Sequence, residues 1–151
     1  MSPTDSSPST ASILLVEDDQ MDVMNVQREL RKQKIEVPLV HARNGREALN
    51  MLRGENGETK IGRPSVVMLD LNMPRLNGLE LLKILRQDPE FQDLNVFIMT
   101  TSDLDTDRLG AKDLGVSGYI IKPLTFDSFG SEGGGTVDGF SLFLDLLRLK
   151  S

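Results

Sequence analysis

The sequence predicts an α/β fold in which helices cover both faces of a five-stranded parallel sheet. Short apolar runs rich in β-branched residues are typical of strands that are buried on both faces, and four such runs are found at residues 13–16, 66–69, 96–99 and 119–121. Segments with the apolar period of an amphipathic helix separate most of these runs. This alternation indicates parallel strands that are joined by right-handed crossovers.

The first part of the chain contains two strand–helix units. The first strand is expected over Ser12–Val16, and a helix is expected over Met21–Lys34 because three apolar residues share one face: Val23, Val26 and Leu30. Asp19 is expected to cap this helix, and the alternative is that it adds charge to a metal site. The second strand is expected over Val37–Ala42, and a helix that opens at Asn44 or Gly45 follows it.

A polar, glycine-rich segment leads into the second part of the chain. This segment, Gly54–Pro64, is expected to be a loop. The third strand, Ser65–Asp70, precedes a helix that starts at Asn77-Gly78. The fourth strand, Asn95–Met99, precedes a helix over Asp105–Leu114.

The two ends of the chain are less regular. Residues 1–11 are mostly Ser, Thr, Pro and Asp and are expected to be a disordered tail, so the domain spans residues 12–151. The fifth strand, Gly118–Ile121, is followed by a segment, 125–151, that glycines interrupt; Thr125–Phe129 begins as a plausible helix, but one continuous helix is unfavourable. An apolar stripe in this segment comprises Phe140, Phe143, Leu144 and Leu147. It is expected to pack on the sheet as the closing helix. The alternative is that part of the stripe forms a homodimer face together with Phe126 and Phe129.

Composition excludes several classes of function. A net charge of −6 argues against binding to nucleic acid or to an anionic membrane. The chain has no cysteine and one histidine, so thiolate and multi-histidine metal sites are excluded, and we expect His41 to be structural. No stretch approaches membrane-spanning length and no secretory signal is evident, so the expected location is the cytoplasm.

Each of the four apolar runs ends at a polar residue, and this is the main clue to function. Five strands suit the flavodoxin-like order 2-1-3-4-5, in which strands one and three meet at the switch point where ligands bind. Glu17, Asp18 and Asp70 are then expected to face one another. Because three converging carboxylates repel, a cation is needed, and oxygen ligands that await a phosphate suit Mg²⁺ better than Ca²⁺.

The other two strand ends add a hydroxyl, Thr100, and a cation, Lys122. No serine, cysteine or histidine stands where a hydrolytic triad requires it, so the remaining nucleophile is a carboxylate, and aspartyl phosphates are a known covalent solution. The expected chemistry is therefore phosphoryl transfer, with Mg²⁺ and Lys122 neutralising charge on the phosphoryl oxygens.

Four motifs carry a resemblance to a known family. They are Leu15-Val16-Glu17-Asp18-Asp19, Met68-Leu69-Asp70-Leu71-Asn72-Met73-Pro74 with Asn77-Gly78, Thr100-Thr101-Ser102, and Gly118-Tyr119-Ile120-Ile121-Lys122-Pro123. Together they resemble the receiver domain of two-component response regulators, over about residues 12–125. The resemblance implies a flavodoxin-like (βα)5 receiver fold.

The resemblance also implies a role for each matched residue. Asp70 matches the phospho-acceptor, which becomes a 4-aspartylphosphate, and Lys122 matches the residue that pairs with the phosphoryl group. Asp18 matches the direct Mg²⁺ ligand, Glu17 the acid that binds through water, and Asn72 the residue that gives a backbone carbonyl. Thr100 matches the phosphoryl hydrogen-bond donor, and Tyr119 the aromatic that changes rotamer with it or, equally, a plain half-buried aromatic.

The expected function is a stand-alone response regulator, because the 29 residues after Lys122 are too few for a DNA-binding output domain. Its partners are then a sensor histidine kinase, similar to the phytochrome-type kinases, and a downstream protein or phosphotransfer partner. It would catalyse its own phosphorylation and slow dephosphorylation. The alternatives are a pseudo-receiver that binds without phosphorylation, and a Mg²⁺-dependent phosphohydrolase.

Overall fold

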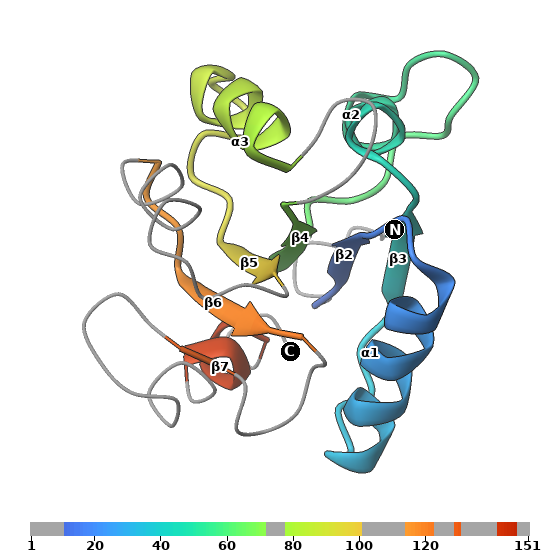
Figure 1. The fold of residues 1–151 in the computed structure, drawn as a ribbon. Helices are drawn as coiled ribbons and strands as arrows, with labels where there is room; N and C mark the ends of the chain where they lie inside the picture. The colour runs from blue at the N-terminus through green and yellow to red at the C-terminus, as the bar shows by residue number, and fades with distance from the viewer. Residues whose placement is uncertain (1–10, 72–77, 101–113, 123–128, 131–141, 148–151) are drawn as a thin grey trace, which may run out of the picture.

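The computed structural model describes residues 11–71, 78–100, 114–122, 129–130 and 142–147. Its central element is a sheet (Figure 1), which has six strands. The order of the strands in the sheet is β3-β2-β4-β5-β6-β7. Five strands are parallel and short, and their bounds are β2 Ile13–Val16, β3 Leu39–Ala42, β4 Val66–Asp70, β5 Val96–Thr100 and β6 Gly118–Ile121. In chain order these five follow the predicted 2-1-3-4-5 arrangement, which is confirmed.

The sixth strand was not predicted. It is β7, Phe129–Gly130, and it pairs antiparallel with β6 at the edge of the sheet. Phe129 was expected in the plausible start of a helix, and this expectation is wrong. A strand at the edge of a sheet forms backbone hydrogen bonds with one neighbour only, and edge strands are often very short.

The helices form in the predicted places. They are α1 Gln20–Lys32, α2 Gly45–Arg53 and α3 Gly78–Gln87. Asp19 caps α1, because its side chain accepts a hydrogen bond from the Met21 amide. The predicted helix over 105–114 lies largely outside the described residues.

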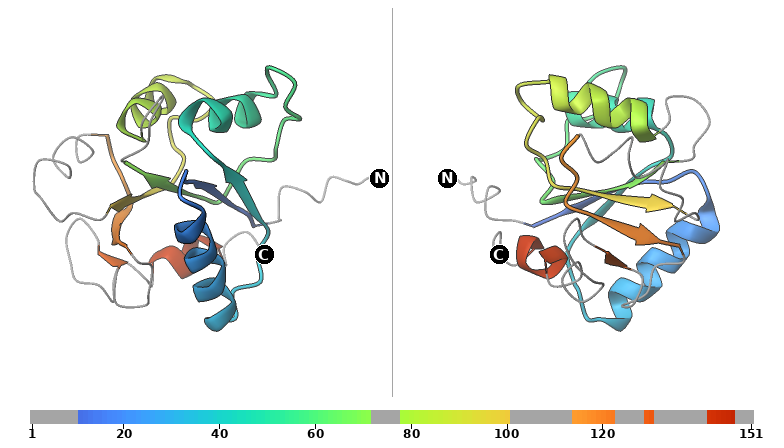
Figure 2. Two further views of the ribbon diagram at one scale, coloured as in Figure 1. Left: turned by 45° about the vertical axis from the view of Figure 1, so that its right-hand side comes forward. Right: turned by 60° about the vertical axis from the view of Figure 1, so that its left-hand side comes forward.

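Helices cover both faces of the sheet (Figures 1 and 2). Each face carries a separate core, because successive strand residues point to opposite faces. On β2, Leu14 and Val16 belong to the cluster under α2 and α3, whereas Ile13 and Leu15 belong to the cluster that includes α1. The helical residues 142–147 also cover the α1 face, where Phe143 is fully buried and packs edge-on against Phe97. This confirms that the C-terminal stripe packs on the sheet through Phe143 and Leu147.

The loop at 54–64 is held by the turn after α3. Three ion pairs join the two segments and the end of α2: Arg53–Asp88, Lys60–Glu90 and Arg63–Asp93. At the start of the chain, residues 1–10 of the expected tail lie outside the described residues, and Ala11, its last residue, is buried. No helix in the described part of the chain is both long enough and apolar enough to cross a membrane.

Candidate functional site

The carboxyl ends of β2 and β4 bring three predicted acids together. These strands are neighbours, with Val16 opposite Leu69, so Glu17 and Asp70 follow at the same edge of the sheet. One carboxylate oxygen from each of Glu17, Asp18 and Asp70 lies within 4.8 Å of the others. Glu17 and Asp70 are buried, whereas Asp18 is exposed. The predicted convergence of these three residues is therefore confirmed by the geometry.

Local structure explains why these acids stay in place. The Glu17 amide donates to the Ala42 carbonyl, so the chain remains tied to β3 for one residue beyond β2. The Asp19 amide then donates to Glu17 Oε2, at 3.1 Å. At the other strand, Gly78 allows α3 to begin directly against the end of β4. A Cβ at position 78 would lie 2.2 Å from the Asp70 carbonyl oxygen, so only glycine fits there.

Lys122 extends into the same crevice from the end of β6. Its amide donates to the Thr100 carbonyl at 2.8 Å, which fixes the backbone next to β5. Its ammonium lies 2.9 Å from Glu17 Oε1 and 3.1 Å from Asp70 Oδ2. The predicted contact of the lysine with the acids is therefore confirmed.

A further acid, Asp22, also contacts Lys122. Asp22 lies in the first turn of α1, and its Oδ2 accepts a 2.9 Å hydrogen bond from Lys122 Nζ. Asp22 is not among the predicted site residues. The signal was present, because Asp22, Val26 and Leu30 are spaced four residues apart, and Val26 and Leu30 mark the face of α1 that is buried.

Burial and the charges of this cluster raise the pKa values of Glu17 and Lys122. Burial raises the pKa of Glu17 to about 8, Asp70 raises it as well, and Lys122 acts against both. Burial acts to lower the pKa of Lys122, but its hydrogen bond with Asp22, its close contact with Glu17 and the charge of Asp70 outweigh that effect, so the pKa is raised. The lysine therefore stays charged, and Glu17 holds a proton readily at neutral pH.

The arrangement fits a divalent cation. Glu17 Oε1 is enclosed and has a charge contact with Lys122 that is not aligned as a hydrogen bond, so this oxygen has no hydrogen-bond partner among the described residues. An enclosed carboxylate oxygen of this kind is costly unless a further positive group satisfies it. Hard oxygen donors from Glu17, Asp18 and Asp70 suit such a cation. Asn72, the other predicted ligand, lies outside the described residues.

The two predicted switch residues are both buried. Thr100 ends β5, and Tyr119 lies on β6 in the core cluster under α2 and α3. Thr100 is opposite Ile121, and Tyr119 is two residues earlier on β6, so Thr100 and Tyr119 project from the same face of the sheet as diagonal neighbours. The structure thus brings the two residues together.

His41 does not join the acids but supports them. Its Nε2–H donates a 2.7 Å hydrogen bond to the Glu17 carbonyl oxygen, which braces the turn after β2. The prediction that His41 is structural is consistent with this contact. That this contact is made to a residue of the site was not predicted.

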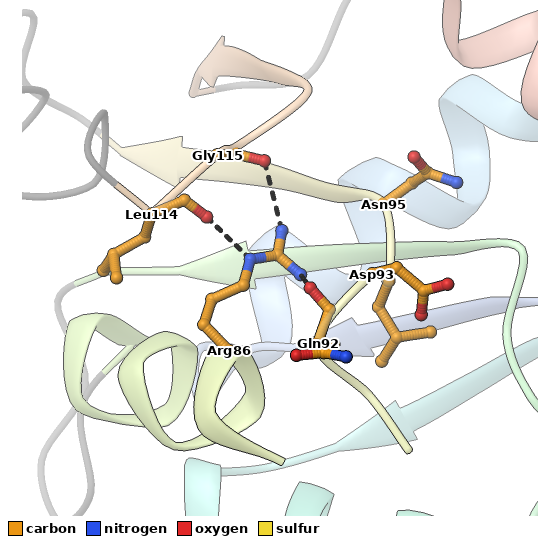
Figure 3. A pocket seen from close by; sticks show the side chains of 7 residues that line it. Arg86, Gln92, Asp93, Asn95, Leu114 and Gly115 are labelled. Carbon is orange, nitrogen blue, oxygen red and sulfur yellow. Dashed lines mark hydrogen bonds between the residues drawn. The ribbon is translucent and has the colours of Figure 1, made fainter. Parts of the chain in front are cut away.

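A separate hollow of about 360 Å³ lies at the opposite edge of the sheet, before β5 and β6 (Figure 3). Its guanidinium group, on Arg86, donates to the carbonyl oxygens of Leu114, Gln92 and Gly115 at 2.6, 2.9 and 3.2 Å. Because these carbonyl oxygens already accept hydrogen bonds from the guanidinium group, Arg86 links α3 to the segment that precedes β6, and we interpret the hollow as structural.

Comparison with known proteins decides the family. Residues 13–131 match the model of the response regulator receiver domain. The chain belongs to the response regulator receiver family. Members of this family work in two-component signalling with sensor histidine kinases, and the predicted resemblance is confirmed.

Individual relatives include regulators of phytochrome signalling. The chain is 34% identical over 110 residues to the response regulator Rcp1 of Synechocystis sp. strain PCC 6803, which covers 73% of this chain and 75% of Rcp1. The bacteriophytochrome response regulator AtBRR is 29% identical, with a TM-score of 0.74 over 93% of this chain and 94% of AtBRR.

Two further structures bear on ligands. The Mn²⁺-bound form of Rcp1 is 28% identical, with a TM-score of 0.69 over 93% of this chain and 92% of that protein. The phosphorylated cyanobacterial phytochrome response regulator RcpA is 28% identical, with a TM-score of 0.69 over 93% of this chain and 91% of RcpA. These two proteins are similar to this receiver in sequence as well as in fold.

Proposed function

We propose that this receiver accepts a phosphoryl group on Asp70 from a phosphohistidine of a sensor kinase. The observation that carries the proposal is the meeting of Glu17, Asp18, Asp70 and Lys122 at one edge of the sheet. A buried nucleophilic carboxylate beside two further acids and one fixed cation suits phosphoryl transfer, in which catalysis is mainly positioning and charge stabilisation.

In the proposed reaction, an oxygen of the Asp70 carboxylate attacks the phosphorus atom of the donor. A carboxyl O–P bond forms, the P–N bond to the donor imidazole breaks, and the imidazole nitrogen keeps the electron pair. Lys122 Nζ, 3.1 Å from Asp70 Oδ2, lies close enough to contact an oxygen of the transferred group. Thr100, at the end of the neighbouring strand, would donate its hydroxyl to another oxygen.

We propose Mg²⁺ as the cation, held by Glu17, Asp18, Asp70 and the carbonyl of Asn72. When bound, Mg²⁺ supplies positive charge that balances the acids and the phosphoryl oxygens. The enclosed oxygen of Glu17 and the hard donor set support a divalent cation. The Mn²⁺-bound structure of Rcp1 is consistent with this class of ion.

We propose that phosphorylation is transmitted through Thr100 and Tyr119. A hydroxyl drawn toward the phosphoryl group would leave space beside it, and Tyr119 is its diagonal neighbour on the same face of the sheet. A change of the Tyr119 rotamer would then alter the surface beside β6. The output would be a contact with a downstream protein or phosphotransfer partner.

A phytochrome-type kinase is the partner that we propose. The similarity to Rcp1 and to AtBRR supports this class of kinase. The homodimer stays a prediction. The buried Phe143 and Leu147 are used within the fold, so a dimer face would have to use other residues of the C-terminal segment.

The test is phosphorylation by a small donor. Acetyl phosphate with Mg²⁺ should add one phosphoryl group, measured by intact mass, and Asp70→Asn should abolish the adduct. Asp93→Asn is the matched control, because Asp93 is an exposed acid that pairs with Arg63 away from the site. An adduct that persists in the Asp70→Asn variant would reject Asp70. Mg²⁺ binding without any adduct would favour the pseudo-receiver alternative.

A further inference from the structure

Lys122 has three carboxylate neighbours, and they are not equivalent. Its ammonium lies 2.9 Å from Glu17 Oε1, 2.9 Å from Asp22 Oδ2 and 3.1 Å from Asp70 Oδ2. The contact with Asp22 is an aligned hydrogen bond, whereas the contact with Glu17 Oε1 is not. An ammonium group has three donors, and a charge-assisted hydrogen bond fixes one of them in direction.

Asp22 also stands apart from the cation group. The acids that could share an ion in the described part of the chain are Glu17, Asp18 and Asp70. Two of the three partners of Lys122 are therefore shared with that group, and Asp70 is in addition the proposed nucleophile. Asp22 is the partner that neither the cation nor the phosphoryl group would occupy.

The position of Asp22 allows it to act on a flexible side chain. Asp22 is carried by α1, which is anchored on the sheet by Val23, Val26 and Leu30, and it is 100 positions away from Lys122 in sequence. The Lys122 side chain is 9% exposed and that of Asp22 is 22% exposed, so the pair is largely shielded from solvent. A lysine has four rotatable side-chain bonds, so one fixed anchor limits where its ammonium can lie.

We infer that Asp22 is a positioning residue for phosphoryl transfer, which holds the Lys122 ammonium at the crevice while Glu17 and Asp70 serve the cation and the phosphoryl group. The inference deepens the proposed function and depends on its assignments of Asp70 and Lys122. Asp22 makes no bond with the transferred group. Its effect passes through Lys122, whose ammonium is kept within reach of the phosphoryl oxygens.

The experiment is a double-mutant cycle on the initial rate of phosphorylation by acetyl phosphate at saturating Mg²⁺. Asp22→Asn preserves shape and removes the charge, and we expect it to lower the rate about tenfold, the size of one hydrogen bond to a charged group. In a Lys122→Met background, the same substitution should change the remaining rate less than about twofold, because Asp22 then has nothing to position.

Asp19→Asn is the matched control. It removes one acid close to the site, and asparagine caps a helix as well as aspartate does, so the cap at the Met21 amide is retained. This variant should stay within about twofold of the parent rate, because exposed charges contribute little. Asp22→Glu retains the charge and should recover most of the rate.

A second measurement does not depend on activity. The Lys122 ammonium should give a slowly exchanging proton signal by NMR in the parent and in Asp19→Asn, and a fast-exchanging one in Asp22→Asn. Three results would overturn the inference: an unchanged rate in Asp22→Asn, an equal loss in the Lys122→Met background, or an equal loss in Asp19→Asn. A parent that forms no adduct, or an adduct in Asp70→Asn, would instead reject the proposed function.

Discussion

Removing the Phe143 side chain should undock the C-terminal helical segment from the sheet. Phe143 is fully buried, and its ring meets that of Phe97 edge-on at a centroid distance of 5.5 Å and an interplanar angle of 87°. A buried Phe→Ala change costs about 3–5 kcal/mol. An aromatic pair contributes about 0.5–1.5 kcal/mol beyond the area that it buries.

We therefore expect Phe143→Ala to lower the free energy of unfolding by about 4 kcal/mol, out of the 5–15 kcal/mol that is typical of a domain. With a urea dependence of about 2 kcal/mol/M, the unfolding midpoint should fall by about 2 M. Circular dichroism in urea measures this. Asp145→Ala, in the same helical segment but exposed, should stay within about 0.5 kcal/mol.

The same titration separates packing within one chain from a dimer. Packing inside the monomer predicts a midpoint that is independent of protein concentration, whereas a dimer interface makes the midpoint rise with concentration. A loss below about 1 kcal/mol in Phe143→Ala, or a midpoint that rises with concentration, would refute the reasoning. Combining Phe143→Leu with Phe97→Leu should show a coupling of about 0.5–1.5 kcal/mol.

Three further predictions concern the surroundings of the site. Gly78→Ala places a Cβ 2.2 Å from the Asp70 carbonyl, so it should cost about 1–3 kcal/mol in urea titrations and slow phosphorylation; Gly62→Ala, with open space around it, should do neither. Arg86→Met removes three hydrogen bonds to carbonyl oxygens and should lower the free energy of unfolding by about 2 kcal/mol. The phosphorylation rate should not change, because the hollow lies at the other edge of the sheet. An equal loss of stability in Lys83→Met, at an exposed position of the same helix, would contradict this prediction. The pKa of Glu17 is raised from 4.5 to about 8 beside Asp70 and Lys122, so between these pH values the folded state holds a proton that the unfolded state has lost. The free energy of unfolding in metal-free buffer should therefore fall as the pH rises through that range. Glu17→Gln should flatten this pH dependence, and a free energy of unfolding that rises with pH would contradict the prediction.

The sequence predicted the central strands and the acids at their ends because both depend on local pattern and on one topological rule. Continuous apolar runs place β2, β4 and β5 in the middle of the sheet, where both faces are covered. Once the order of the strands is known, Glu17 and Asp70 must emerge side by side. Neither inference needs any knowledge of side-chain packing.

Features that depend on packing between distant segments could not be predicted in this way. Strand β7 has two residues and forms because β6 offers an unpaired edge, which no local pattern announces. The contact of His41 with the Glu17 carbonyl requires the lateral register of β3 and β2, in which His41 lies opposite Leu15. The contact of Asp22 with Lys122, on which its proposed role rests, depends on how α1 lies relative to the end of β6.

The charge of the site explains why a residue outside the strand ends, Asp22 on α1, matters for Lys122. Three acids, Glu17, Asp22 and Asp70, contact one lysine, and Asp18 lies beside Glu17 and Asp70. The buried members of such a group repel one another strongly. Without a cation, the fold limits this repulsion by letting Glu17 hold a proton and by drawing Lys122 onto three carboxylates at once. If Glu17 and Asp70 were the main contacts of this lysine, its ammonium would lose them in the proposed reaction, in which both acids bind the cation and Asp70 also accepts the phosphoryl group. A contact with Asp22 on α1 avoids this loss, because Asp22 can keep the Lys122 ammonium in place while Glu17 and Asp70 exchange their contact with Lys122 for one with the cation.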